Sequence, residues 1–146
     1  MTTIAYDHKN NQVAVDSRAT AGTKIISDKA HKYIEKDGAM WFFTGAIADF
    51  DQLIALNHND KPDIIPDCAA IKVCDDGVYL VTFNGDYCSV CPLRYSYSIG
   101  SGENYATSSM DFGSSAKDAV KYASTRDCHT GGKVHVFDTK KMKFVK

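Results

Sequence analysis

Short, mostly apolar runs fill the N-terminal part of the chain. Two pairs of runs are separated by turn-forming residues: Ile4–His8 and Val13–Asp16 around Lys9–Gln12, then Lys32–Glu35 and Met40–Thr44 around Lys36–Ala39. Such runs, bounded by Asn, Asp and Gly, are typical of β-strands joined by tight turns. We therefore expect two β-hairpins before Gly45.

The apolar period changes after Gly45. The apolar residues of this segment lie at helical spacing: Ile47, Phe50, Leu53 and Ile54. This spacing predicts a helix from Ile47 to about His58. The next segment, Asn59–Asp67, holds two of the three prolines, and we expect a loop there.

The remaining chain returns to strands and then adds two helices. We expect strands at Ala69–Cys74, Val78–Phe83, Tyr87–Cys91 and Tyr95–Ile99, helices at Gly102–Asp111 and Ser115–Thr125, and a last hairpin of Val134–Asp138 with Lys143–Val145. Ser114 or Ser115 is the expected cap of the second helix. This order of elements predicts a single α+β domain, residues 1–146, with sheet packed on sheet and helices outside.

Composition excludes several classes of function. The net charge is −1, and no dense cluster of Lys or Arg suggests a nucleic-acid partner. The apolar runs are too short to span a membrane, and the first residues do not resemble a signal peptide. An odd number of cysteines, five, then favours reduced thiols and a cytoplasmic location. The basic segment Lys140–Lys146 alternates with apolar residues, as a final strand with one solvated face would.

Cys88 and Cys91 have the C-x-x-C spacing of zinc and redox sites. No second pair of this kind follows, and no histidine stands at zinc-finger spacing, although Cys68 could approach in space. We therefore favour buried structural thiols over a metal site, and we expect no cofactor.

The start of the chain carries the strongest chemical signal. Thr2 directly follows Met1, and Ala14–Gly22 places an Asp-Ser-Arg unit at the end of the second apolar run. A hydroxyl becomes a nucleophile when a base lies beside it, and the smallest such unit uses the α-amine of the same residue. Removal of Met1, which methionine aminopeptidase performs before small residues such as Thr, would give Thr2 both groups.

These segments resemble the β subunits of the proteasome and their bacterial relative HslV. Four further segments extend the resemblance in the same order: Lys29–Tyr33, Phe43–Phe50, Ile99–Ala106 and Arg126–Gly132. The resemblance implies the four-layer αββα sandwich of N-terminal-nucleophile hydrolases. The family normally has a second long helix where this chain has only Asn59–Asp67, so we expect one helical layer to be reduced.

The resemblance also implies roles for individual residues. Thr2 matches the nucleophile, and Lys32 matches the lysine beside it, whose charge would stabilise the alkoxide. Asp16 matches the carboxylate that pairs with this lysine. A salt bridge on the surface of a hairpin is the alternative reading of the pair.

A second group of residues matches the surroundings of the nucleophile. Gly45 matches the residue whose N–H faces the oxyanion, and a glycine there would let substrate approach closely. Ser101, Asp127 and Thr130 match the groups around the threonine amine, although the family usually has a serine at the position of Thr130. Arg18 is expected to brace the site or the following loop and to take part in no chemical step.

Substrate contacts follow from the same resemblance. An extended peptide would add as a strand against Ala19, Thr20 and Ala21 on one side and Gly45, Ala46 and Ile47 on the other. The first specificity pocket would be lined by Ala19, Ala30, Ile34, Phe43 and Ile47. Because this lining is apolar, we expect cleavage after hydrophobic residues.

The resemblance thus implies a threonine-type endopeptidase, working as the proteolytic subunit of a homo-oligomeric ring, single or stacked. Its substrates would be unfolded polypeptides supplied by a partner ATP-dependent unfoldase, because the chain has no phosphate-binding loop of its own. A catalytically silent protein of the same fold is the alternative, favoured by the short chain and by the presence of Met1. A small-molecule amidohydrolase is a third reading, but such enzymes generally begin with Cys or Ser.

Overall fold

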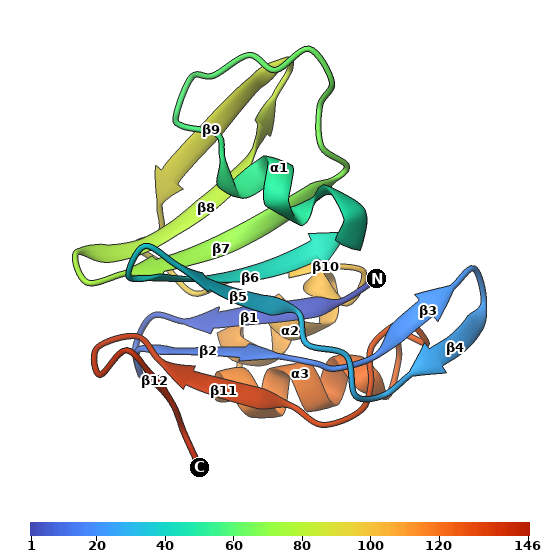
Figure 1. Ribbon diagram of the computed structural model, residues 1–146. Coiled ribbons are helices and arrows are strands. Elements are labelled where there is room, and N and C mark those ends of the chain that lie inside the picture. The colour runs from blue at the N-terminus through green and yellow to red at the C-terminus, as the bar shows by residue number, and fades with distance from the viewer.

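The computed structural model describes residues 1–146 and contains two five-stranded antiparallel sheets and one separate two-stranded hairpin (Figure 1). The strands are β1 (Thr3–Asp7), β2 (Gln12–Val15), β3 (Ala19–Ala21), β4 (Lys24–Ser27), β5 (Tyr33–Lys36), β6 (Ala39–Gly45), β7 (Cys68–Cys74), β8 (Gly77–Asn84), β9 (Tyr87–Pro92), β10 (Tyr97–Gly100), β11 (His135–Asp138) and β12 (Lys143–Phe144). The helices are η1 (Ile47–Asp49), α1 (Phe50–Ile54), α2 (Glu103–Asp111) and α3 (Ala116–Ser124).

The first sheet has the strand order β10-β1-β2-β11-β12, so β1 lies between β10 and β2. β1 is paired on both sides, with Ile4 opposite Val15 on β2 and Thr3 opposite Gly100 on β10. Successive side chains of a strand point to opposite faces. Ile4 therefore packs between the sheets, whereas Ala5 packs against the helices.

The second sheet has the order β5-β6-β7-β8-β9 and covers the inner face of the first. Met40 and Phe42 of β6 face the first sheet and join the core between the sheets. Trp41 and Phe43 face outward, where the ring of Phe43 stacks on Phe50 of α1 at 4.3 Å between centroids. Both faces of β6 are therefore buried.

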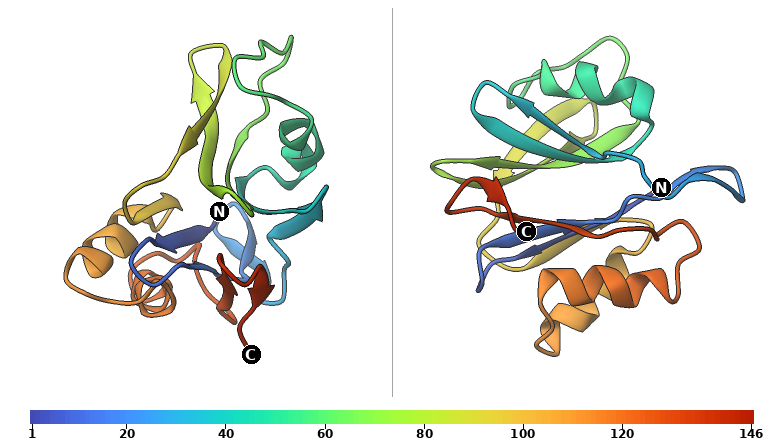
Figure 2. Two further views of the ribbon diagram at one scale, coloured as in Figure 1. Left: turned by 90° about the vertical axis from the view of Figure 1, so that its left-hand side faces the viewer. Right: turned by 60° about the horizontal axis from the view of Figure 1, so that its bottom comes forward.

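The two outer layers are unequal, as Figures 1 and 2 show. α2 and α3 cover the first sheet through small side chains such as Ala106 and Ala119, which allow close packing. The second sheet carries only η1, the five-residue α1 and the irregular segment that follows. The sandwich fold with one reduced helical layer is thus confirmed. None of the helices has the length and apolar character needed to cross a membrane.

The structure differs from the element predictions in two places. The helix expected to reach His58 ends at Ile54, because the Asp60 carboxylate accepts a hydrogen bond from Asn57 N at 2.7 Å and Asn59 takes a left-handed conformation, φ 72°. These turn features replace the last helical turn. The hairpin of β3 and β4 was not predicted, and it projects from the body of the molecule (Figure 1).

The C-x-x-C pair lies on β9 and does not form a cluster. Cys88 is buried in the outer core of the second sheet, whereas Cys91 is exposed. Residues three apart on a strand point to opposite faces, so the two thiols cannot meet. The expectation of a buried structural thiol is confirmed for Cys88, and its burial raises the pKa of the thiol. It is wrong for Cys91.

Candidate active site

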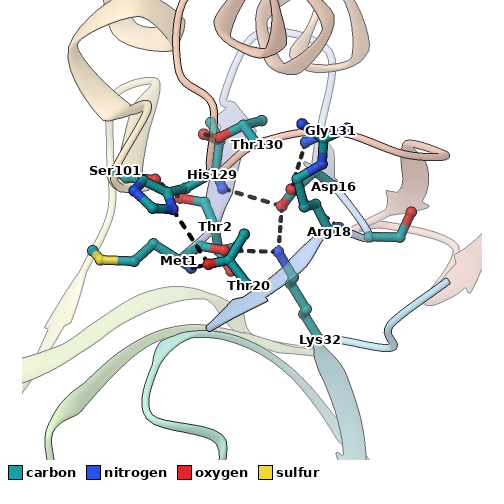
Figure 3. Close-up of polar contacts among 12 residues, drawn as sticks. Met1, Thr2, Asp16, Arg18, Thr20, Lys32, Ser101, His129, Thr130 and Gly131 are labelled. Carbon is teal, nitrogen blue, oxygen red and sulfur yellow. Dashed lines mark hydrogen bonds and ion pairs between the residues drawn. The ribbon is translucent and has the colours of Figure 1, made fainter. Parts of the chain in front are cut away.

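An ion pair is buried where the N-terminal end of β1 meets the ends of β2 and β5 (Figure 3). Lys32 Nζ lies 2.9 Å from Asp16 Oδ1, and the two side chains are only 5% and 0% exposed. Asp16 directly follows β2, and Lys32 directly precedes β5. The structure thus brings together two residues that lie far apart in the sequence, and it excludes the alternative of a surface salt bridge.

The Asp16 carboxylate is fully engaged. Its Oδ1 also accepts a hydrogen bond from Thr3 N at 3.2 Å, and its Oδ2 accepts from Gly131 N at 3.0 Å and from Arg18 N at 3.3 Å. Hydrogen bonds of this kind offset the cost of burying a carboxylate. Burial lowers the pKa of Lys32, and the attraction of Asp16 opposes this lowering only in part.

The ammonium of Lys32 has a second partner, which lies next to Thr2. Lys32 Nζ donates a hydrogen bond to the carbonyl oxygen of Met1 at 3.0 Å. The cation is therefore held on the peptide unit immediately before Thr2. Thr2 itself is 4% exposed, and with Met1 in place its Oγ1 makes no hydrogen bond to Lys32.

The α-amine of Met1 belongs to the same cluster. It donates a hydrogen bond to Thr20 Oγ1 on β3 at 3.3 Å. Burial lowers the pKa of this amine, and so does the positive charge of Lys32, while Asp16 and Asp127 oppose them. A lowered pKa increases the fraction of free base near neutral pH, which suits an amine that must accept a proton.

A group of hydroxyls around one carboxylate lies on the other side of Thr2. Ser101 Oγ and Thr130 Oγ1 both donate to Asp127 Oδ2, the latter at 2.7 Å. Thr130 Oγ1 is also 2.6 Å from Thr3 Oγ1, and Ser101 Oγ lies 3.5 Å from the carbonyl oxygen of Thr2. The three predicted residues are therefore together and border the backbone of Thr2 and Thr3.

Asp127 is held in its charged form. Burial raises its pKa, but the hydrogen bonds from Ser101, Thr130 and His129 N outweigh burial, so the pKa lies below its ordinary value. A permanently charged carboxylate at this place can attract an ammonium group on Thr2.

His129 joins the site although no role was predicted for it. Its Nδ1 lies 3.2 Å from Thr20 Oγ1, the atom that accepts the hydrogen bond from the Met1 amine. This contact ties β3 to the segment that carries Asp127. Its position two residues after Asp127, within the matched segment Arg126–Gly132, was the only signal in the sequence, and it does not indicate the approach of β3.

Arg18 braces the neighbouring loops, as expected. Its Nε and Nη2 donate to the carboxylate of Asp28 at 2.8 and 3.2 Å, and its Nη1 donates to the carbonyl of Cys128 at 3.1 Å. The guanidinium thus connects the end of β4 with the segment around Asp127. It makes no contact with Thr2.

Two glycines shape the backbone around Thr2. Gly45 has φ +109°, and a Cβ there would lie 2.5 Å from Asp67 O. Gly100 has φ +105°, and a Cβ there would lie 1.8 Å from the carbonyl oxygen of Thr2. A side chain at position 45 would therefore clash with the backbone of Asp67, which explains this glycine independently of substrate access. Likewise, only a glycine at position 100 allows β10 to pass Thr2.

The predicted substrate-binding residues occupy different environments. Ala19, Thr20 and Ala21 form β3, whose Thr20 accepts the hydrogen bond from the Met1 amine, and Ala46 and Ile47 follow the end of β6. Ile47 is 65% exposed, while Ala30 and Ile34 are half-buried. Phe43 is completely buried under α1 and offers no surface to a substrate in this conformation. No group of His, Cys, Asp or Glu side chains is arranged to hold a metal ion.

Sequence comparison finds relatives over the whole chain. Proteasome subunit beta type-8 from Canis lupus familiaris is 28% identical, and the match covers 99% of this chain and 67% of the relative. The same subunit from Rattus norvegicus is 29% identical with the same coverage. The alignments extend over 189 positions, more than the 146 residues of this chain, because the relatives carry stretches that it lacks. No protein-family model matches the chain.

Solved structures match the fold closely. BPH of Thiobacillus denitrificans in complex with epoxomicin superposes with a TM-score of 0.71 at 16% identity, over 93% of this chain and 97% of that one. HslV from Trypanosoma brucei gives 0.70 at 17% identity, over 94% and 99%. The sequence and the sandwich fold of this protein therefore relate it to the proteasome β-subunit and HslV family.

Proposed function

We propose that the chain is a threonine-type endopeptidase whose nucleophile is Thr2, exposed by removal of Met1. The observation that carries this proposal is the buried pair of Lys32 and Asp16, whose ammonium rests on the peptide unit before Thr2. A buried ion pair is poor at stabilising a fold, because desolvation offsets most of its attraction. A charged group kept at this place is better explained by chemistry at Thr2.

The steps follow from the positions of the groups. Without Met1, Lys32 loses its carbonyl acceptor, and its charge acts on the hydroxyl of Thr2 and lowers the pKa of that hydroxyl. The α-amine of Thr2 accepts the hydroxyl proton while Oγ1 attacks the peptide carbonyl. The same proton passes to the leaving amine, which gives an ester on Thr2 that water then hydrolyses.

The neighbouring residues hold the reacting groups. Asp127, with Ser101 and Thr130, lies beside the backbone of Thr2 and attracts its ammonium form. The backbone N–H of Gly45 is the proposed donor to the oxyanion of the tetrahedral intermediate. A substrate that pairs as a strand with β3 and with the backbone after Gly45 is held mainly through its main chain, so polypeptides of varied sequence would be accepted.

Assembly belongs to the same proposal. We infer a homo-oligomeric ring, single or stacked, in the cytoplasm, which would separate the active sites from folded proteins. An ATP-dependent unfoldase would supply unfolded polypeptides. The support is the relation to proteasome subunits and HslV, together with five cysteines that are all free thiols, as a reducing compartment would keep them.

A catalytically silent protein of the same fold is the second candidate. One observation favours it: with Met1 in place, the Met1 carbonyl holds the ammonium of Lys32 and the hydroxyl of Thr2 has no hydrogen bond. In this arrangement the α-amine belongs to the wrong residue. The two candidates differ in whether Thr2 carries a free α-amine and a reactive hydroxyl.

Intact mass spectrometry separates them. The untagged protein is weighed before and after incubation with a peptide epoxyketone, which forms a stable double adduct only with a hydroxyl and a free α-amine on the same residue. Loss of Met1 and one adduct per chain, absent in Thr2→Ala, would support the peptidase. Retained Met1, or a free Thr2 that takes no label, would support the silent protein.

A further inference from the structure

A cavity of about 620 Å³ opens beside the proposed nucleophile, on the side of β10. It shares Gly45 and Ser101 with the candidate site, and Met1 also lines it. Its other walls come from the segment Ile65–Ala69, from β8 and from the first turn of α2. This volume lies in the range of pockets that bind small molecules or side chains. None of the predicted specificity-pocket residues lines this cavity.

The lining has a definite chemical character. Leu80 and Ile99 contribute apolar side chains to the lining, and the exposed residues Asp67 and Glu103 are its only acidic members. No lysine, arginine or histidine lines the cavity, so Met1 supplies its only cationic group, the α-amine. Apolar side chains together with carboxylates suit a long aliphatic side chain with a positive charge at its tip.

Thr44 gives an independent sign that the cavity binds a ligand. It is 7% exposed, lines the cavity and lies on the inner face of β6. Its Oγ1 is buried and has no hydrogen-bond partner. Buried hydroxyls are normally paired, and an unpaired one is costly to the folded state. A polar atom of a bound peptide would relieve this cost.

We propose that the cavity receives the substrate residue that follows the scissile bond, and that it selects lysine or arginine there. This inference rests on the proposed peptidase function. The acyl half of the substrate is assigned to β3 and the backbone after Gly45. No residue of β3 lines the cavity, which begins on the opposite side of Thr2 at Ser101. The leaving half of the peptide therefore runs past Ser101, and its first side chain enters between Leu80 and Ile99.

Peptides that differ only in the residue after the cleaved bond test this inference. We compare kcat/KM for lysine, norleucine, alanine and glutamate at that position. Norleucine should exceed alanine by about tenfold or more, since three methylene groups are buried. Lysine should exceed norleucine by about three- to fivefold, the range of a partly exposed ion pair. Glutamate should be cleaved most slowly.

Charge variants show whether the cavity causes the preference. Glu103→Gln, combined with Asp67→Asn, should bring the ratio of lysine to norleucine close to one. Glu35→Gln is the matched control, because Glu35 lines a different cavity formed with Phe137 and Phe144, and it should keep the wild-type ratio. Equal loss of the preference in the control would refute the assignment to this cavity.

Epoxyketone labelling of Thr2 separates the two levels of the proposal. A labelled protein that cleaves the lysine and norleucine peptides equally would overturn the inference and leave the peptidase function standing. A protein that neither labels nor cleaves would overturn both. A labelled protein with the expected ratios, lost only in the Glu103 and Asp67 variant, would support both.

Discussion

Asp16→Asn isolates the electrostatic contribution of the buried ion pair. Asparagine has the size and shape of aspartate, so the substitution leaves no cavity. In the wild-type protein each carboxylate oxygen accepts two hydrogen bonds, Oδ1 from Lys32 and Thr3, and Oδ2 from Gly131 and Arg18. The single oxygen of asparagine can serve only one of these two pairs, and its NH₂ group then faces the donors of the other pair.

The expected magnitude follows from burial. The side chains of Asp16 and Lys32 are 0% and 5% exposed, so water cannot replace the lost charge. Removing one partner of such a pair costs about 3–5 kcal/mol, because the remaining charge is left uncompensated. We expect the free energy of unfolding to fall by this amount. Adding Lys32→Met should recover much of the loss, since the double variant has no unpaired buried charge.

Urea denaturation at a fixed protein concentration measures the change. Trp41 is the single tryptophan and is buried on the second sheet, so its fluorescence reports unfolding. Asp28→Asn is the control, because its ion pair with Arg18 is partly exposed to water and should contribute far less than a buried pair. If Asp16→Asn cost no more than this control, the pair would not behave as a buried one, and the reasoning would be refuted.

Three further predictions concern the same end of the sandwich. Thr44→Val should raise the free energy of unfolding by about 1 kcal/mol, because it removes an unpaired buried hydroxyl; a lower urea midpoint would contradict this. Gly100→Ala should leave no folded protein by circular dichroism, since the added Cβ would lie 1.8 Å from Thr2 O; a native spectrum would show that β10 can move away. The pKa of Asp127 is lowered in the folded protein, so its stabilisation is present above the unfolded value of about 3.9 and is lost as pH falls through the folded pKa. Asp127→Asn should therefore be less stable than the wild type at pH 7, with the gap closing in acid; a gap independent of pH would refute the assignment.

Short apolar runs bounded by turn residues made most strands predictable, and burial on both faces limited what else could be inferred. β1 and β2 have neighbours on each side in the sheet, yet their apolar runs and the turn between them are local features. β6 is buried on both faces, so its sequence has no alternation that would tell which side Phe43 occupies. The position of Phe43 under α1 depends on which segment packs on the outer face of the second sheet. The β3–β4 hairpin is mostly exposed and lacks a strong apolar pattern, so its second strand could not be predicted.

Most of the candidate site was predictable from the resemblance, whereas its contacts were not. Asp16, Lys32, Ser101 and Asp127 come together as the matched motifs imply. The contact of Thr20 with His129 joins residues 109 positions apart, and nothing in either segment anticipates it. Lys32 donates a hydrogen bond to the carbonyl oxygen of Met1 and not to the hydroxyl of Thr2. This contact depends on the presence of Met1 and is visible only in the structure.

The burial of β1 also sets a time limit on maturation. Thr2 to Tyr6 are all buried, and β1 pairs with β2 on one side and β10 on the other. An external peptidase must hold the residues on both sides of the bond before Thr2, so it would have to pull β1 out of the finished sheet. β10 ends at Gly100, so the sheet cannot close around β1 before roughly 5–20 s of synthesis at ribosomal rates of 5–20 residues per second. With an external peptidase, the proportion of chains with a free Thr2 would therefore depend on a race between cleavage and closure of this sheet, and chains that fold first would keep the blocked terminus.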